Sequence, residues 1–455
     1  MWVCSLLNIP TMPQPDISRH TAIFYALPAM AAAVPTIPAY VLLPSYYGDD
    51  LGLGLAITGA VLLLVRVIDM ATDPLIGWLS DVTGRRKIWV GFGAVLAGIG
   101  LWYLFTPPDV PDAIYLFVWA SVLFLGWTLF QVPYLAWGAD LSGDYKTRTS
   151  LTALREGAGL IGIVLAGGIP VLIHATDRAD EIRMLAVVTL VLGAVFVALL
   201  IWQVPDPVAQ RKRPKSIAMG SPTVAIRLGL RSLRDNRLFV RLLAAWMING
   251  LAAGLPAVCF PLFVRYYLQL DQGTENVLIL LYFLAAIIAI PLWAFLSARL
   301  GKHRVWCLAM AIAIIAFGFV PFLSVGDAVG FGVICLVTGA ALGADLALPP
   351  AIQADVDDWD HYRFGTRRTA LLFALWNMTN KLAMALAAGI ALPILGAFGL
   401  TDDAGQKSGA LVVLVLIYAV IPIVLKSGAI GMMWRFPLGA SHQIAICRRL
   451  SRRTV

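Results

Sequence analysis

The chain has 455 residues, of which 60% are hydrophobic and only 13% are charged. Soluble proteins carry about 25% charged residues, so this composition predicts a membrane protein with several spans. The formal net charge is +8, but the basic residues lie in short connections between apolar segments, as the positive-inside rule expects, which argues against nucleic-acid binding. The five cysteines and five histidines are dispersed, so neither a disulfide framework nor a metal site is expected.

The first residues do not resemble a secretory signal. Residues 1–19 lack a basic n-region followed by an apolar core and a small-residue cleavage site, so no cleaved signal peptide is predicted. Met12 is an alternative to Met1 as the start of translation.

Twelve apolar segments are long enough to cross a bilayer, which takes about 20 helical residues. They are residues 21–48, 53–80, 88–106, 112–141, 149–175, 184–204, 238–268, 273–299, 303–325, 328–354, 367–396 and 408–433. Basic connections lie at 84–87, 144–148, 211–237, 301–304 and 361–368, and acidic or polar ones at 46–50, 106–113, 176–183, 269–276, 324–330 and 401–406. The positive-inside rule places the basic set in the cytoplasm. Because the number of spans is even, both termini are then cytoplasmic, in agreement with the basic tail at 448–453.

A long basic connection divides the chain into two sets of six spans. The expected parts are an N-terminal tail at 1–20, a six-helix bundle at 21–204, a cytoplasmic linker at 205–237, a second six-helix bundle at 238–433 and a basic tail at 434–455. An amphipathic surface helix is expected within the linker, at 226–233.

The two halves share an internal repeat. Residues 73–89 (DPLIGWLSDVTGRRKIW) align with 290–306 (IPLWAFLSARLGKHRVW) at an offset of 217 without a gap, and 133–151 aligns with 349–371 after a few insertions. Two parallel repeats of six spans, each with a basic loop after its second span, are typical of the major facilitator superfamily. The predicted fold class is therefore an all-α polytopic membrane protein with the major facilitator fold, in which 12 transmembrane helices form two six-helix bundles.

Three charged residues interrupt the second apolar segment. At about 100° per residue in a helix, Arg66, Asp69 and Asp73 fall within about 60° of one another. A charge at mid-bilayer costs about 2.5 to 3.5 kcal/mol, so this face is expected to point to the protein interior or a water-filled cavity. The two carboxylates can share a cation through oxygen ligands, or one of them can carry a proton. Arg66 would hold the net charge of the group near minus one when no cation is bound.

A structural role is the alternative for Asp73, whose carboxylate could serve backbone groups freed by Pro74. The repeat argues against it. The second half keeps the proline and the basic loop, but it has Ala286 and Ile290 in place of the two acids. The loop therefore belongs to the shared scaffold, whereas the acids indicate function.

Three stretches carry a resemblance to a known family. They are R-x-x-D-x-x-x-D-P-x-x-G-x-x-x-D-x-T-x-R at 66–85, VPY…DLS…R at 132–148 and ADVDD…G-x-RR…K at 354–381. In these motifs, and over nearly its whole length, the chain resembles the glycoside-pentoside-hexuronide:cation symporters. The resemblance implies sodium- or proton-coupled uptake of a sugar or related solute, with Asp69 and Asp73 as the cation site and Thr128 as a further ligand.

The sequence departs from the melibiose carrier, a member of this family, at several positions. Gln131 stands where that protein has a third aspartate, so it offers a carbonyl ligand without a charge and leaves the cation open. Ala33 replaces an aspartate that binds galactosides, and Leu135 replaces a tryptophan that stacks on the sugar. Melibiose is therefore not the expected substrate.

The resemblance implies contact with the solute for Tyr40, Arg155 and Lys381. For Lys381 the alternative is snorkelling to the inner surface, but counting from the basic loop places it about 20 Å into its span, which favours the cavity. For Arg155 the alternative is a structural pair with Glu156.

Four further residues are candidates for contact with the solute. Asp345 is an intramembrane acid that could bind hydroxyl groups or pair with Lys381. Trp127, Tyr134 and Trp376 could stack on a sugar ring, although such aromatic residues in membrane helices more often serve packing or interfacial belts.

Charged residues at the cytoplasmic ends of the spans are expected to latch the two halves in the outward-open state and to separate as the halves rock. These gate residues are Asp81, Arg85, Asp140, Asp144, Arg148, Asp355, Asp357, Arg367 and Arg368.

The predicted function is cation-coupled secondary transport across the plasma (inner) membrane by a monomer, with Na⁺ or H⁺ as the coupling ion and with no cofactor. Besides the lipid bilayer, the expected partner is a small solute, a sugar or sugar derivative. The alternatives are a lysolipid carrier, because eukaryotic lysolipid transporters resemble the same family, and a non-transporting membrane sensor or scaffold. No nucleophile–base arrangement or metal cluster is evident, so an enzyme is not expected.

Overall fold

The computed structural model describes residues 18–141, 145–172, 177–206, 236–364, 369–400, 408–438 and 446, and these fold as helices joined by short turns. The helices are α1 (Arg19–Ala33), α2 (Leu43–Ser45), α3 (Leu55–Thr83), α4 (Arg86–Phe105), α5 (Ala113–Leu141), α6 (Tyr145–Leu172), α7 (Arg178–Gln203), α10 (Arg237–Leu262), α11 (Gln272–Leu300), α12 (Lys302–Phe319), α13 (Ala328–Phe364), α14 (Thr369–Ala397), α15 (Ser408–Val415) and α16 (Ile421–Met433). Short π or 3₁₀ segments are η2 (Pro38–Leu42), η3 (Tyr46–Asp50), η4 (Phe263–Tyr267), η5 (Val320–Phe322) and η6 (Leu416–Val420). Twelve helical stretches are long and apolar enough to cross a membrane. The predicted fold class is confirmed in this respect.

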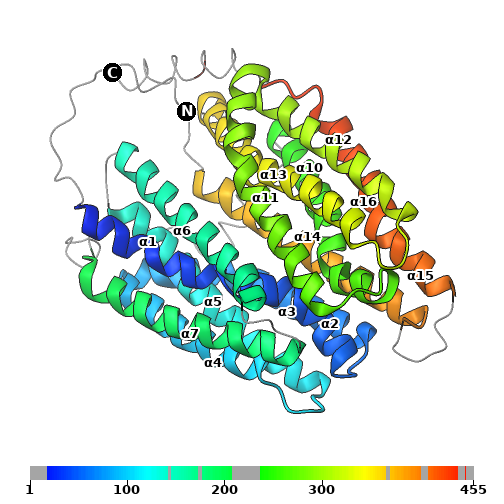
Figure 1. The fold of residues 1–455 in the computed structure, drawn as a ribbon. Coiled ribbons are helices and arrows are strands. Elements are labelled where there is room, and N and C mark those ends of the chain that lie inside the picture. The colour runs from blue at the N-terminus through cyan, green and yellow to red at the C-terminus, as the bar shows by residue number, and fades with distance from the viewer. Residues whose placement is uncertain are drawn as a thin grey trace.

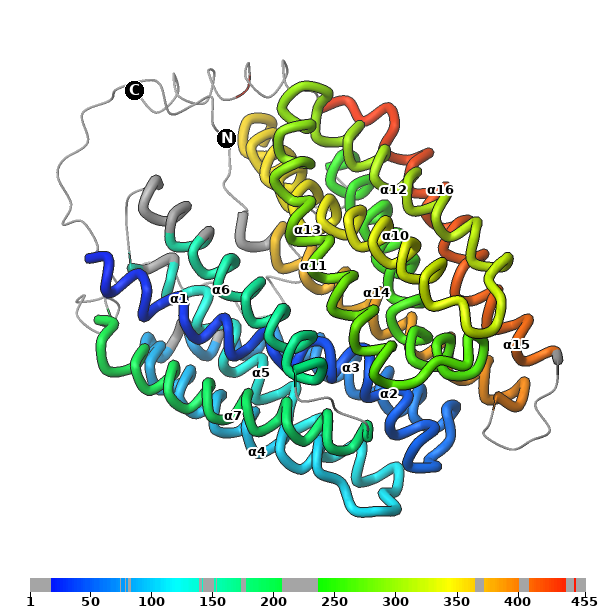
Figure 2. The backbone as a smooth tube through the Cα atoms, in the orientation of Figure 1, coloured from blue at the N-terminus to red at the C-terminus, as the bar shows by residue number. Residues whose placement is uncertain are grey.

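The helices form two groups, α1–α7 and α10–α16, which lie side by side (Figure 1). The halves meet mainly where α3 packs on α14 and where α6 packs on α11, and the backbone tube shows the same arrangement (Figure 2). Most of the linker expected at 205–237, including its surface helix at 226–233, lies outside the described residues. The expected domain boundaries therefore stay predictions.

The structure carries the repeat seen in the sequence. Helix α11 begins and ends 217 residues after α3, and η4 spans the positions 217 residues after η3. Gly84 and Gly301, which end α3 and α11, both have positive φ angles, 62° and 91°. Glycine tolerates a positive φ without a steric penalty, so each half ends its second span at a glycine, although their ψ angles differ, 19° and 140°.

Polar side chains begin several helices. Ser18, Asp177, Asn236 and Asp271 each accept a hydrogen bond from a backbone N–H in the first turn of the helix that follows. These N-caps satisfy donors that have no partner within the helix. At Asp271, hydrogen bonds from the hydroxyl and backbone N–H of Thr274 hold the pKa of the carboxyl below its ordinary value.

The α4–α5 contact depends on glycine. A Cβ added at Gly126 would lie 2.2 Å from the backbone nitrogen of Ala97, whereas one at Gly193, on α7, would meet nothing within 4 Å. Alanine normally favours a helix over glycine by about 1 kcal/mol. We therefore expect Gly193→Ala to be neutral or stabilising and Gly126→Ala to destabilise the protein by about 1 to 3 kcal/mol, because the helices must separate. Thermal unfolding of the purified variants measures both, and equal midpoints would contradict the prediction.

Candidate functional site

Two carboxylates and a hydroxyl meet in the interior of the first half. The Oγ1 atom of Thr128, on α5, lies 2.8 Å from Oδ1 of Asp69 and 2.9 Å from Oδ1 of Asp73, both on α3. Asp69 and Thr128 are buried, at 4% and 1% exposed, and Asp73 is half-buried. Three oxygen atoms thus converge where the sequence places the cation site.

Two basic side chains neutralise these acids. The guanidinium of Arg66 lies 3.5 Å from Oδ2 of Asp69. The ammonium of Lys381, on α14 of the other half, lies 2.7 Å from Oδ2 of Asp73 and 3.0 Å from Oδ2 of Asp69. Arg66 also lies over the rings of Tyr40 and Phe124, at 4.4 Å and 3.5 Å from their centroids. Cation–π contacts of this kind favour a buried guanidinium.

The expected net charge of minus one is wrong for this conformation. The sequence-based prediction included Arg66 but not Lys381, whose addition balances the two acids. Lys381 reaches Asp73 because α14 and α3 pack closely: a Cβ added at Gly59 would lie 2.9 Å from Leu392 Cβ, and one at Gly389 would lie 2.7 Å from a methyl group of Leu63. The lysine therefore faces the interior between the halves and does not snorkel.

The oxygen atoms around Thr128 suit a small hard cation, which prefers carboxylate and hydroxyl ligands. Gln131 lies one helical turn after Thr128 and is half-buried, but it makes no hydrogen bond to Asp69 or Asp73. Within the described ranges, no group of three histidine, cysteine or acidic side chains could hold a metal ion. The acid pair with Thr128 is therefore the best candidate for ion binding.

Asp345 does not pair with Lys381, the alternative that the sequence left open. Its Oδ1 accepts a hydrogen bond of 2.5 Å from Nε1 of Trp306, and its Oδ2 lies 3.6 Å from Nζ of Lys426. Lys426 in turn donates to Oδ1 of Asn249 at 2.8 Å. The reason is geometric. Lys381, on α14, points toward the first half and is held by Asp69 and Asp73, whereas Lys426, on α16, points to Asp345 within the second half.

The candidate aromatic residues differ in their surroundings. Tyr134 is 1% exposed, stacks on Tyr25 at 4.9 Å and donates its hydroxyl to the carbonyl oxygen of Tyr25 at 2.5 Å. Trp376 is 5% exposed and stacks on Trp246 at 4.5 Å. Both rings serve packing in this conformation. Trp127, which is half-buried, stays a candidate for contact with a solute.

Arg155, on α6, forms an ion pair of 2.5 Å with its neighbour Glu156. The side chain of the arginine is 16% exposed and that of the glutamate 68%. The structure thus shows the local pair that was the alternative to solute contact. An exposed partner on the same helix leaves the guanidinium able to exchange it for a ligand.

The expected cytoplasmic gate is described only in part. Asp355 bonds Nζ of Lys302 at 2.6 Å within its own half, so it does not latch the two halves here. Arg85 is exposed, and Asp357 is half-buried. The side chains of Asp81, Asp140, Asp144, Arg148, Arg367 and Arg368 lie outside the described residues.

Comparison with known proteins identifies the family. The family model described as MFS/sugar transport protein matches residues 24–440, which is more than half of the chain. The chain belongs to this family. The predicted resemblance to glycoside-pentoside-hexuronide:cation symporters is thereby confirmed, and the protein is a membrane transporter rather than an enzyme.

The chain is similar at low identity to several named family members. It is 23% identical over 436 residues to the glucuronide carrier protein homolog of Escherichia coli (strain K12), covering 93% of each chain. It is 24% identical over 403 residues to the isoprimeverose transporter of Lactiplantibacillus pentosus, with 83% of this chain and 80% of the relative covered. It is 24% identical over 405 residues to the human sodium-dependent lysophosphatidylcholine symporter 1, with 80% and 73% covered.

A solved structure supports the fold. A mutant form of the nucleoside transporter NupG superposes with a TM-score of 0.64 at 16% sequence identity, covering 91% of this chain and 98% of that one. Together with the 12 spans, this match confirms the major facilitator fold.

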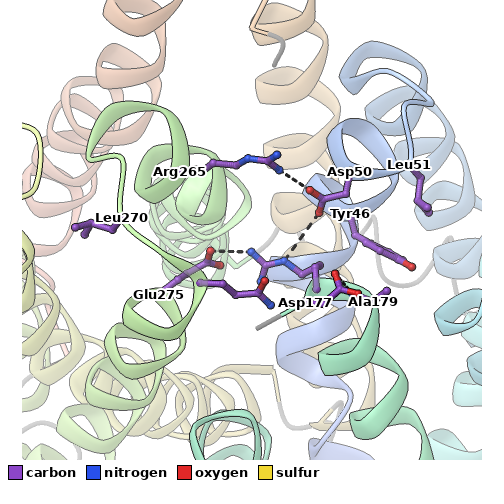
Figure 3. Close-up of a pocket in the computed structure, with 10 residues that line it drawn as sticks. Tyr46, Asp50, Leu51, Asp177, Ala179, Arg265, Leu270 and Glu275 are labelled. Atoms are coloured by element: carbon purple, nitrogen blue, oxygen red, sulfur yellow. Dashed lines mark hydrogen bonds and ion pairs between the residues drawn. The ribbon is translucent and has the colours of Figure 1, made fainter. Parts of the chain in front are cut away.

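A further group of ion pairs lies at the end of the molecule where η3 and η4 meet. Arg178, on α7, lies 2.7 Å from Oε2 of Glu275, on α11, and 4.0 Å from Asp50 (Figure 3). Arg265, on η4, contacts Asp49 at 3.3 Å and also Asp50. The pair of Arg178 with Glu275 and the pairs of Arg265 with Asp49 and Asp50 join the two halves.

Two neutral side chains extend this group. Tyr266 donates to Asp49 at 2.5 Å, and Gln272 donates to Glu181 at 2.7 Å. A cavity of about 430 Å³ lies among these groups, with Tyr46, Asp177 and Leu270 in its lining (Figure 3). We call Asp49, Asp50, Arg178, Glu181, Arg265, Tyr266, Gln272 and Glu275 the η3–η4 cluster.

The η3–η4 cluster and Lys426 were not predicted from the sequence. Most members of the cluster lie in the connections at 46–50, 176–183 and 269–276, which were noted only as acidic or polar. Arg265 and Tyr266 lie near the end of the apolar segment at 238–268. Lys426 is a lone lysine in the apolar stretch IPIVLKSGAI, the same signal that drew attention to Lys381.

Proposed function

We propose that this MFS/sugar transport protein is a symporter that couples the uptake of a sugar, glycoside or sugar acid to the entry of Na⁺ or H⁺. The observation that supports it is the oxygen set of Asp69, Asp73 and Thr128, which is held by Lys381 from the opposite half. Both carboxylates lie within the membrane and contact a lysine of the other half. A coupling ion bound there can therefore control the movement of the two halves.

Lys381 can serve as a tethered cation for this site. When an ion enters among the three oxygens, the ammonium is no longer required for charge balance and is released from Asp73. The contact between α3 and α14 at this point is then weakened. Without either cation, the paired carboxylates would remain charged in a low-dielectric interior, which is costly. Return of the empty carrier therefore requires that Lys381 re-engage, and coupling follows from this exchange.

The orientation in the membrane is part of the proposal. With both termini in the cytoplasm of a plasma (inner) membrane, the η3–η4 cluster lies at the outer end and closes it. The membrane potential then favours cation entry by up to about 2.3 kcal/mol per charge per 100 mV. We propose a monomer as the transporting unit.

The solute is proposed from the relatives and from the open candidates. Two relatives are named for glucuronide and isoprimeverose, both of them sugar derivatives. Tyr40, Trp127 and Arg155 are the proposed contacts with the solute, together with Lys381 once it is released. A lysolipid is the second candidate, because relatives at 22% to 24% identity are lysophosphatidylcholine symporters.

Uptake into proteoliposomes tests the proposal. Purified protein is reconstituted and supplied with methyl glucuronide, isoprimeverose or lysophosphatidylcholine, with an inward gradient of Na⁺, of H⁺ or of neither. We expect one of the two sugar derivatives to accumulate above its equilibrium level only when a cation gradient is present. Accumulation of the lysolipid alone would favour the second candidate. No accumulation of any probe would contradict the proposed solute class.

A further inference from the structure

The second half contains its own buried ionic group, in α10, α12, α13 and α16, which pack together in the second bundle (Figure 2). Asp345 is 8% exposed, Lys426 4% and Asn249 1%. Asp345 accepts one hydrogen bond, from Trp306, and Lys426 donates one, to Asn249. A carboxylate can accept about four hydrogen bonds and an ammonium donates three, so both groups keep unused capacity.

A cavity adjoins this pair. It has a volume of about 90 Å³, and Asp345 and Lys426 line one part of it. The remaining lining is mainly apolar, but it includes the phenols of Tyr282 and Tyr418 and the hydroxyl of Thr338. A water molecule needs about 10 to 15 Å³ of such space, so the cavity is large enough to bring water to the carboxylate.

The place of this group in the repeat is informative. Asp345 lies on α13, the helix of the repeat that corresponds to α5 with Thr128. The offset of 217 that relates α3 to α11 sets Arg66 and Tyr40 against Phe283 and Ala257, both of which line the cavity. The Asp345 group therefore lies in the second half close to the place that corresponds to the acid site of the first.

The two sites differ in what they can bind. In the second half, Ala286 and Ile290 stand in place of Asp69 and Asp73, so Asp345 is a single carboxylate. Lys426, 3.6 Å away, repels a metal cation. A proton needs no set of oxygen ligands and neutralises the one carboxylate, which makes it the cation that suits this site.

We propose that Asp345 is a proton-binding site of the second half, distinct from the ion site at Asp69 and Asp73. A proton from water in the cavity binds Oδ2 of Asp345, which becomes neutral. The pair changes from a net charge of zero to plus one, and Lys426 loses its counter-charge while it keeps Asn249. Contacts between α13 and α16 are thereby weakened, so that protonation changes the packing of this half. Uptake then responds to pH even where Na⁺ is the coupling ion.

The groups around the Asp345–Lys426 pair and its cavity come from all the neighbouring helices. They are Asn249 on α10, Tyr282 on α11, Trp306 on α12, Lys426 on α16, Tyr418 on η6 and, on the helix of Asp345 itself, Thr338 and Cys335. Among these, Lys426 is the charged one. Its substitution is therefore the most informative companion to substitution of Asp345 itself.

Infrared difference spectroscopy of the full-length protein in lipid tests the proposal without a solute. On acidification in constant Na⁺, we expect a C=O band of a protonated carboxyl group that Asp345→Asn removes. Asp360→Asn is the matched control, because Asp360 is a fully buried acid on the same helix that accepts from Asn236 instead. That variant should keep the band. Lys426→Met should make the band appear at higher pH, since the carboxylate has lost its counter-charge.

If Asp345→Asn fails to fold, Asp345→Glu provides the test instead. It keeps the carboxyl group, so it should keep a band that responds to pH but at a changed frequency. Identical spectra for the parent protein and Asp345→Asn would overturn the proposal, as would an unchanged band in Lys426→Met. These readouts do not depend on transport. Failure of the uptake experiment would therefore contradict the proposed symport but not the proton site. Failure of the infrared experiment would contradict the proton site but not the symport.

Discussion

Asp73→Asn is expected to remove the dependence of solute uptake on a cation gradient. The change keeps the size of the side chain but removes the negative charge of the carboxylate that binds Lys381 at 2.7 Å and accepts a hydrogen bond from Thr128. A hydrogen bond to a charged group contributes about 1.5 to 3 kcal/mol. Loss of this one should therefore lower cation-driven uptake by about 10-fold to about 150-fold.

Lys381→Met should have a different effect from Asp73→Asn. If Lys381 competes with the coupling ion, its removal leaves Asp69 and Asp73 with a net charge that attracts Na⁺ more strongly. Thermal unfolding measures this, because a ligand that binds only the folded state raises the unfolding midpoint. We expect Na⁺ to stabilise Lys381→Met more than the parent protein, while cation-driven accumulation is lost.

Thr72→Ala is the control for both variants. Thr72 lies on the same helix but donates its hydroxyl to the backbone oxygen of Asp69, outside the three converging oxygens. It should keep the uptake and the Na⁺ response of the parent. Cation-dependent uptake that persists unchanged in Asp73→Asn would contradict the coupling role of the acids.

The fold was predictable because its signals are local or repeated. Span length and hydrophobicity define the helices, and the offset of 217 relates the two halves without any knowledge of contacts. Gly84 and Gly301 end equivalent helices for the same conformational reason. The π segments η3 and η4, at equivalent places in the two halves, were not predicted. A π segment depends on packing that the apolar pattern of the sequence does not encode.

The candidate site was predictable on one helix but not across the interface. Helical spacing alone brings Asp69 and Asp73 to one face, and the family resemblance adds Thr128. The partner of Lys381 was not predictable, because it lies 308 residues away and depends on how Gly59 and Gly389 let two helices approach. For Asp345 the sequence suggested Lys381 as a possible partner, whereas the structure pairs it with Lys426, which is also a lone lysine in an apolar segment.

Neutralising the η3–η4 cluster is expected to open the end of the molecule that the cluster closes. Glu275 is 3% exposed and its partner Arg178 is 12% exposed at the side chain. Removing one partner of a buried ion pair leaves an uncompensated charge, at a cost of about 3 to 5 kcal/mol. The closed conformation alone would bear this cost, so Glu275→Gln should shift the equilibrium toward the open conformation by at least about 100-fold.

Distances between spin labels measure this shift. Val110 and Val325 are 85% and 64% exposed and lie in the connections that follow α4 and α12, one in each half. Labels on cysteines at these two positions, with the native cysteines replaced, should move apart in Glu275→Gln. Asp180→Arg is the control, because Asp180 is exposed on the same helix as Arg178 and forms no ion pair with the other half in the described part of the chain. It should keep the distance of the parent.

The double variant Arg178→Gln with Glu275→Gln decides whether the two residues act as a pair. If the shift in Glu275→Gln comes from the guanidinium left without its partner, removing Arg178 as well should reverse part of it. Independent residues would instead give additive shifts. Arg178 also contacts Glu181 at 3.3 Å and Asp50 at 4.0 Å, so the reversal should be partial. Additive shifts would show that Arg178 and Glu275 do not act as a pair, and unchanged label distances in Glu275→Gln would show that the η3–η4 cluster does not hold this end closed.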